Sequence, residues 1–314
     1  MDKKDSLTLL ILTVCLVIFP FIVTNTYYIS TMVFVGINGI IAIGLSLLMG
    51  YAGQISIGHA AFFGLGAYTS AVLTAKLGFH PWGAFFMGIL LSSCVALIIG
   101  IPSLKLKGHY LAMATLGFGE ITYIVFNELT DITGGPSGIG GIPKISLAGY
   151  TMNTDIKYYF FVWAFLLLIL TLSLNLIHSR IGRALRSIHD SEVAANAMGI
   201  NTSKLKIQVF MISAVFGSVA GSLYTHYVTF VSPSSFGLFF SILLVMMVVI
   251  GGMHSVWGAL IGATLLTILP EFLRALKDFE IFVYGAVLLL IMIFLPRGLI
   301  GGLEYLFNRL IKKV

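Results

Sequence analysis

The sequence predicts an all-α integral membrane protein, a polytopic helical bundle of about ten transmembrane helices with both termini in the cytoplasm. Of the 314 residues, 58% are hydrophobic and only 10% are charged, whereas soluble domains are about 25% charged. No Asp, Glu, Lys or Arg occurs at residues 6–75 or 207–270, and each stretch has room for two or three helices of about 20 residues. Its apolar runs are continuous, which favours helices over barrel strands. This composition excludes a soluble enzyme and a disordered chain.

Ten apolar segments are expected to cross the bilayer, and together they form one transmembrane domain over residues 1–314. The first is interpreted as an uncleaved helix, because no signal-peptide cleavage motif follows it. The segments are 7–24, 28–50, 58–77, 81–104, 109–127, 158–178, 207–228, 236–252, 257–273 and 279–295. With the N-terminus inside, thirteen lysines and arginines fall on the cytoplasmic side and five outside, as the positive-inside rule requires. The net charge of +6 is therefore ascribed to a basic cytoplasmic face and not to binding of nucleic acid.

Two connections are longer than simple turns and are candidate functional loops. The outer loop, residues 128–157, contains TGGPSGIGGIP, and the inner loop, residues 179–206, carries arginines at positions 180, 183 and 186. This arginine flank is expected to face lipid headgroups or acidic groups of a partner. The glycine-rich outer loop is either a surface that contacts another protein or a turn that contacts nothing, and both interpretations remain open.

The inner loop contains a predicted amphipathic helix outside the membrane. Asp190 or Ser191 is suited to be its N-cap, and Gly199 is suited to a left-handed C-terminal cap. One face of about two turns is made of small or apolar side chains, namely Val193, Ala194, Ala197 and Met198. Such a face indicates docking to a partner protein, because alanines permit close approach. The alternative is a basic loop that contacts nothing.

A glycine-rich segment at residues 50–68 places Gln54, Ser56 and His59 among small residues. Polar groups and glycines at membrane depth are typical of a broken helix that lines a water-filled path, and the alternative is close packing at a turn. Thr115 is a further candidate for the path. Glu120 lies within a span, where a carboxylate is either functional or paired inside the bundle.

The sequence contains no constellation for catalysis or metal binding. It lacks a phosphate-binding P-loop, a zinc-protease motif and a cluster of Cys and His at metal-ligand spacing, and both cysteines fall within apolar runs. We therefore expect no catalytic residues, no metal site and no cofactor bound by this chain. If the protein transports uphill, its energy comes from an ion gradient or from another polypeptide.

Four motifs in order make the chain resemble a known family. They are GYAGQISIGHAAFFGLGAYTSAVL, LKGHYLAMATLGFGEI, TGGPSGIGGIP and GRALRSIHDSEVAANAMGINTSKLKIQVFMISAVFGSVAG. These motifs resemble the permease subunits of branched-chain amino-acid ABC importers, of the LivM type, over about residues 38–296. The resemblance implies a bacterial inner-membrane protein that translocates leucine, isoleucine or valine. It also implies a LivH-type second permease, two cytoplasmic ATPases that hold ATP and Mg, and an extracytoplasmic substrate-binding protein.

The resemblance also assigns roles to the two loops. The inner loop resembles the ATPase-coupling pattern E-A-A-x-x-x-G through Ala194, Ala195 and Gly199, while Val193 stands at the glutamate position and Glu192 precedes it. The implied coupling residues are Asp190, Glu192, Val193, Ala194, Ala195, Ala197, Met198 and Gly199. The implied contacts with the binding protein are Gly134, Gly135, Pro136 and Gly138. Related permeases carry urea or short amides. Two other classes of protein remain open: a proton-coupled carrier that uses Glu120, and a membrane scaffold without transport.

Overall fold

The computed structural model describes residues 3–23, 25–103, 106, 108–147 and 150–272, with isolated residues between 282 and 302. This part of the chain is mainly helical. The helices are α1 (Lys3–Ile22), α2 (Thr26–Ser46), α3 (His59–Ala71), α4 (Pro81–Ser103), α5 (His109–Glu128), α6 (Thr130–Thr133), α7 (Asp155–His178), α8 (Arg180–Asp190), α9 (Glu192–Ala197), α10 (Thr202–Val228), α11 (Leu238–Gly251) and α12 (Val256–Phe272). Two π-helical turns, η1 (Leu47–Tyr51) and η2 (Val72–Lys76), extend α2 and α3, and η3 (Gly135–Ser137) and η4 (Pro233–Phe236) are 3₁₀ turns.

Six helical segments of the described chain are long and apolar enough to cross a membrane. They are Lys4–Ile22, Thr26–Tyr51, Pro81–Ser103, Asp155–His178, Thr202–Val228 and Pro233–Gly251. Three further expected spans coincide with α3, α5 and α12, and α12 is shorter than a membrane-spanning helix. The expected span 279–295 lies mostly outside the described residues. The structure thus supports a multi-pass helical protein, and the count of about ten spans stays a prediction.

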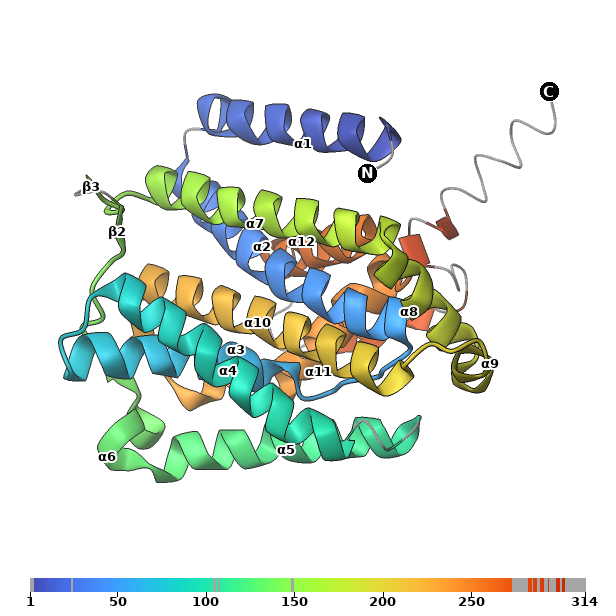
Figure 1. The fold of residues 1–314 in the computed structure, drawn as a ribbon. Helices are drawn as coiled ribbons and strands as arrows, with labels where there is room; N and C mark the ends of the chain where they lie inside the picture. Colours follow the sequence, from blue (N-terminus) through green and yellow to red (C-terminus); the bar gives the residue numbers. More distant parts are fainter. Residues whose placement is uncertain are drawn as a thin grey trace.

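The helix α2 forms the centre of the bundle. Its buried residues run almost without interruption from its middle to its end, and it packs against α7, α10 and α12. Figure 1 shows α2 between α7 and α10, with α1 along the outside of α7 and α5 on the opposite side of the bundle. A helix that is apolar all round is expected at such a buried position.

Small residues allow the main helices to pack at close range. A Cβ atom on Gly66 of α3 would lie 2.2 Å from the carbonyl oxygen of Ser218 on α10, and one on Gly221 would lie 1.9 Å from that of Phe63. Between α11 and α12, a Cβ atom on Gly262 would lie 1.8 Å from the carbonyl oxygen of Met247. These distances exclude any side chain, so the glycines set the helix separations.

The two long loops lie at opposite ends of the bundle (Figure 1). The inner loop folds into α8 and α9, near the N-terminal end of α1. The outer loop contains α6, η3, β1 (Ile139–Gly140), β2 (Ser146–Leu147) and β3 (Tyr150–Thr151). The strand β1 pairs antiparallel with β4 (Phe230–Val231), which follows α10, and β2 pairs with β3. The outer loop is therefore fastened to the end of α10.

Candidate functional site

The inner loop begins at a sharp corner between α7 and α8. Ser179 leaves the helical conformation, and its hydroxyl accepts hydrogen bonds from the backbone N–H groups of Ile181 and Gly182, which caps α8. A Cβ atom on Gly182 would lie 2.3 Å from the carbonyl oxygen of Ile177. Glycine is therefore required at this position, and the corner fixes the direction in which α8 runs.

Two of the three arginines of α8 fold back onto the end of α7. Arg186 donates a hydrogen bond to the carbonyl oxygen of Ile177 at 2.9 Å, and Arg183 donates one to that of His178 at 3.4 Å. A helix leaves these carbonyl groups unpaired at its C-terminus, where positive charge is favourable. Both arginines nevertheless remain exposed, so the expectation that this flank faces headgroups or a partner stays a prediction. Arg180 is exposed.

The helix α9 presents large apolar side chains to solvent. The Ser191 hydroxyl accepts a hydrogen bond from the backbone N–H of Ala194 at 3.3 Å and caps the helix. Gly199 adopts a left-handed conformation, with φ of +82°. Both caps are those that the sequence predicts. Val193 and Met198 are 74% and 84% exposed.

One side of α9 faces solvent and the other faces the protein. Ala194 and Ala197 are exposed, whereas Ala195 is buried. The helix has six residues and is shorter than the expected two turns. The small-residue face of α9 is thus open to solvent, and Ala195 lies on the side of the helix that packs against the protein. Docking of a partner on this face stays a prediction.

Glu192 anchors α9 to the start of α10. Its carboxylate oxygen Oε1 lies 2.8 Å from Lys206 Nζ, and the side chain of Lys206 is only 9% exposed. The Thr202 hydroxyl donates a hydrogen bond to Asn196 Oδ1 at 3.1 Å. Glu192, which the resemblance places among the coupling residues, therefore holds α9 against the start of α10.

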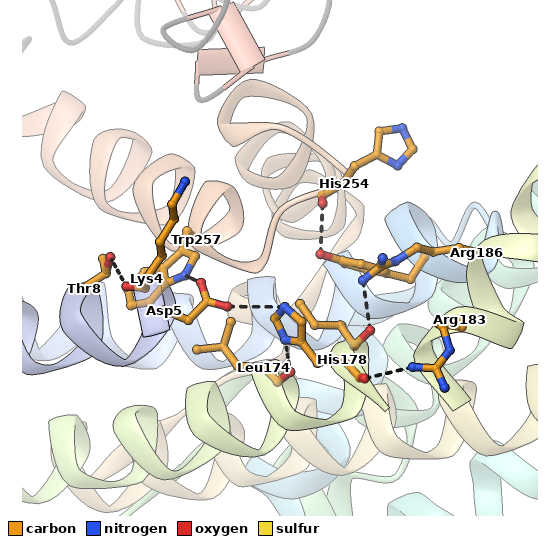
Figure 2. A network of polar contacts seen from close by, with 11 residues as sticks. Lys4, Asp5, Thr8, Leu174, His178, Arg183, Arg186, His254 and Trp257 are labelled. Atoms are coloured by element: carbon orange, nitrogen blue, oxygen red, sulfur yellow. Dashed lines mark hydrogen bonds and ion pairs between the residues drawn. The ribbon is translucent and has the colours of Figure 1, made fainter. Parts of the chain in front are cut away.

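Asp190 ends α8 and lines a polar cavity of about 660 Å³ at the inner end of the bundle. The cavity lies between the start of α1, the end of α7, α8 and the α11–α12 turn. Figure 2 shows its network of contacts. The Trp257 indole N–H donates to one carboxylate oxygen of Asp5 at 3.1 Å, and His178 Nε2 lies 3.4 Å from the other oxygen. Sequence reasoning did not single out these residues, because they lie in separate segments and share no motif.

The segment between α2 and α3 is a true break in the helix. Residues 53–58 are not helical, and Gly53 adopts a φ of +65°. The side chain of Gln54 is 2% exposed, and neither its Oε1 nor its Nε2 has a hydrogen-bond partner among the described residues. A buried amide without partners is costly and calls for a functional explanation.

Three of the other predicted path residues surround this break. His59 is fully buried and hydrogen-bonds through Nδ1 to the Ser56 hydroxyl at 3.2 Å and through Nε2 to the Ser213 hydroxyl at 2.6 Å. The Thr115 hydroxyl accepts a hydrogen bond from the backbone N–H of Ile57 at 3.1 Å. The structure thus brings Ser56, His59 and Thr115 together and adds Ser213, which sequence reasoning missed because it lies 154 residues from His59.

Helix α5 packs directly against the break. A Cβ atom on Gly58 would lie 2.0 Å from the carbonyl oxygen of Thr115, and one on Gly119 would lie 3.3 Å from Gly58 Cα. Glu120 follows on α5 and is half-buried, and no hydrogen bond or ion pair joins it to another described residue. The intramembrane carboxylate therefore lies next to the break, and its role stays a prediction.

A second helix break, between α11 and α12, interlocks with the end of α2. Gly252 has a φ of +118°. The Tyr51 hydroxyl donates to the His254 carbonyl oxygen at 2.9 Å, and His254 Nδ1 lies 2.9 Å from the Gly50 carbonyl oxygen. A Cβ atom on Gly50 would lie 1.7 Å from the carbonyl oxygen of Met253. The second break therefore packs against η1, the π-helical turn that leads into the first break.

The glycines of the outer loop have a structural role of their own. Gly134, Gly135 and Gly138 all have positive φ values. A Cβ atom on Gly138 would lie 2.2 Å from the carbonyl oxygen of Val231 on β4. Pro136 is exposed at the turn. The glycines fold the loop onto β4, so Pro136 is the predicted contact residue that is best placed to meet another protein.

The long apolar helices are those of a multi-pass membrane protein. The sequence profile of the family described as "Branched-chain amino acid transport system / permease component" matches residues 27–295. The chain belongs to this family of branched-chain amino-acid transport permeases, as the motifs predicted.

Individual relatives agree with this assignment. The permease protein LivM of the high-affinity branched-chain amino acid transport system of Salmonella typhimurium strain LT2 is 33% identical, over 95% of this chain and 75% of the relative. LivM of Escherichia coli strain K12 is similar to the same extent. LivH of Escherichia coli strain K12 is 26% identical, over 84% of this chain and 91% of the relative. No solved structure matches the chain.

Proposed function

We propose that this chain is a transmembrane permease subunit of an ABC importer that carries leucine, isoleucine and valine across the bacterial inner membrane. Transport proceeds by ATP-driven alternating access. Membership of the branched-chain amino-acid permease family supports the substrate class. The likeness to both LivM and LivH supports pairing with a LivH-type second permease. ATP and Mg bind to two separate cytoplasmic ATPases, since the sequence lacks a P-loop, and an extracytoplasmic binding protein delivers the substrate.

The exposed face of α9 is the observation that carries this proposal. Val193 and Met198 project into solvent from a short helix outside the spans, where a monomeric surface would favour polar side chains. The neighbouring alanines let another protein approach closely. The capped α8, the Glu192–Lys206 pair and the corner at Gly182 hold this face rigidly. A rigid, apolar and open face is what an ATPase needs to push against.

The helix break next to α5 is the proposed translocation segment. Gln54 keeps two unpartnered polar atoms there, beside the pair of Ser56 and His59 and the hydroxyl of Thr115. These groups offer hydrogen bonds to a polar substrate backbone at the point where α5 contacts the break. At the outer end, the turn at Pro136 is the proposed contact for the binding protein.

Reconstitution of the complex that copurifies with this chain tests the proposal. Proteoliposomes of this complex with added binding protein should accumulate labelled leucine only when ATP is supplied on the cytoplasmic side. Ala194→Glu places a charge on the exposed face of α9 and should abolish substrate-stimulated ATP hydrolysis while membrane insertion is retained. Ser203→Glu is the matched control, because Ser203 is also exposed in the first turn of a helix on the same side. Transport by Ala194→Glu equal to that of the control would contradict docking through α9.

The same preparation separates the alternative functions. A proton-coupled carrier would take up substrate as the purified chain alone under a pH gradient, and Glu120→Gln would abolish this uptake. An importer of urea or short amides would show ATP-dependent uptake that excess urea or acetamide suppresses and excess valine does not.

A further inference from the structure

His189 is the residue of the inner loop that lies next to both helix breaks. It lies next to the last residue of α8. A Cβ atom on Gly53, in the break between α2 and α3, would lie 3.0 Å from His189 Nδ1. The His189 ring also stands edge-on to the ring of His254, in the break between α11 and α12, with 5.0 Å between the ring centroids. One imidazole therefore contacts two breaks that are separated by about two hundred residues in sequence.

A second contact one turn earlier strengthens this link. The guanidinium of Arg186 lies 5.6 Å above the centre of the Tyr51 ring, within the range of a cation–π interaction. Tyr51 in turn donates its hydroxyl hydrogen bond to the carbonyl oxygen of His254. The side of α8 that carries Arg186 and His189 thus rests on η1 and on the second break.

The helix α8 is packed along one face and is joined directly to α9. A displacement of α9 would therefore be passed to the end of α8, where His189 lies. Leu185 and Ile188 are 1% and 3% exposed, and Ser191 joins α8 to α9 without a linker. A glycine at position 53 leaves room for the imidazole, and a Cβ atom there, at 3.0 Å, would require the ring to shift slightly. His189 and His254 are both exposed, so neither ring fills a position in the core.

We propose that His189 is a positioning residue for transport, which transmits the displacement of the docking helix α9 to the two helix breaks through its contacts with Gly53 and His254. The proposal rests on the proposed importer function. It differs from the docking role of α9 itself, because His189 faces the cavity side and its effect passes through the breaks. Loss of such coupling lowers the amount of substrate transported per ATP hydrolysed. It leaves the assembly of the subunits intact.

The contact is expected to depend on pH in a defined direction. Partial burial of the ring and the neighbouring His254 lower the pKa of His189 below its ordinary value of 6.5, and Asp190 opposes the shift. Arg186, Tyr51, Asp5 and His178 are the other titratable or charged groups that line the same cavity. A lowered pKa means that the folded contact holds the neutral ring, so the contact is complete above pH 6.5 and is lost as the pH falls toward the lowered value. Protonated His189 would place a cation beside His254 and Arg186.

The test compares variants of the complete complex in proteoliposomes, with leucine as substrate. His189→Ala should lower leucine uptake per ATP hydrolysed by roughly threefold to thirtyfold, while the copurifying subunits and the basal ATP hydrolysis are retained. His189→Phe keeps a ring against His254 and should restore most of the ratio at pH 7.5, without the loss at lower cytoplasmic-side pH that is expected for the wild type. His109→Ala is the matched control, an exposed histidine in the first turn of α5.

His254→Ala tests the contact from its other side and serves if His189→Ala does not assemble. The double variant should lose no more than the larger of the two single losses, because both remove one interaction. A ratio for His189→Ala equal to that of His109→Ala, or additive losses in the double variant, would overturn the inference. Absence of ATP-dependent uptake in the wild type would instead refute the proposed importer function.

Discussion

Lys206 Nζ lies 2.8 Å from Glu192 Oε1, and this ion pair joins the start of α10 to the first residue of α9. The pair is largely shielded from water on the lysine side, where an ionic contact is stronger and its loss leaves an uncompensated charge. The position of α9 therefore depends on a residue of α10.

The first prediction concerns this ion pair. Lys206→Met should leave the Glu192 carboxylate without its lysine and weaken the anchoring of α9 by about 1–3 kcal/mol. Faster hydrogen exchange of the backbone amides at residues 192–197 is the expected observation. Lys204→Met is the control, because Lys204 is exposed on the same helix. Equal exchange in the two variants would mean that the pair does not hold α9.

The second prediction concerns the contact between the first break and α5. Gly58→Ala would bring a Cβ atom to 2.0 Å from the Thr115 carbonyl oxygen, so the two segments have to separate. Overpacking of this kind costs about 1–3 kcal/mol. The melting temperature of the purified complex should fall, whereas Gly117→Ala, whose Cβ meets no atom within 4 Å, should leave it unchanged. A Gly58→Ala complex as stable as the Gly117→Ala complex would show that the break is looser than described.

The third prediction separates stability from transport at Gln54. The buried amide has no hydrogen-bond partner among the described residues. Gln54→Leu should therefore leave the free energy of unfolding unchanged or raise it by about 1 kcal/mol at most. Leucine uptake should nevertheless fall, because the substrate loses polar groups on its path. Normal uptake by Gln54→Leu would show that Gln54 does not line the path. Ser92→Ala serves as the comparison, because it also removes a buried polar group without a partner among the described residues.

The fourth prediction concerns the large side chains exposed on α9. Val193→Ser combined with Met198→Ser should change the stability of the permease by no more than about 0.5 kcal/mol, because both side chains are in solvent. The amount of ATPase that copurifies with the permease should drop. Undiminished copurification would argue that this face contacts no ATPase.

Local features of the site could be predicted from the sequence, because they depend on neighbours in the chain. Ser191 and Gly199 cap α9 as predicted, since a cap needs only one residue type at one position. The break after Gly53 was one of two interpretations of a glycine-rich run, and the structure shows a break that is also closely packed against α5. The family was likewise predicted from motifs, and the comparison with known permeases confirmed it.

Contacts between distant segments could not be predicted in this way. His59 meets Ser213, and His189 meets His254, without any spacing that indicates either pair. Arg183 and Arg186 are exposed, as their spacing predicts, but their hydrogen bonds to the carbonyl groups at the end of α7 could not be predicted from that spacing. The number of spans is also less certain from sequence where a helix is broken, as after Gly53, or carries a carboxylate, as at Glu120.

The strand pair β1–β4 gives α10 an unusual mechanical position. The helix has 27 residues and is therefore about 40 Å long. At its outer end, Ile139 and Val231 are register partners that bind it to the outer loop, and at its inner end Lys206 binds it to α9. A single stiff rod thus connects the face where a loaded binding protein would press with the face where an ATPase would dock.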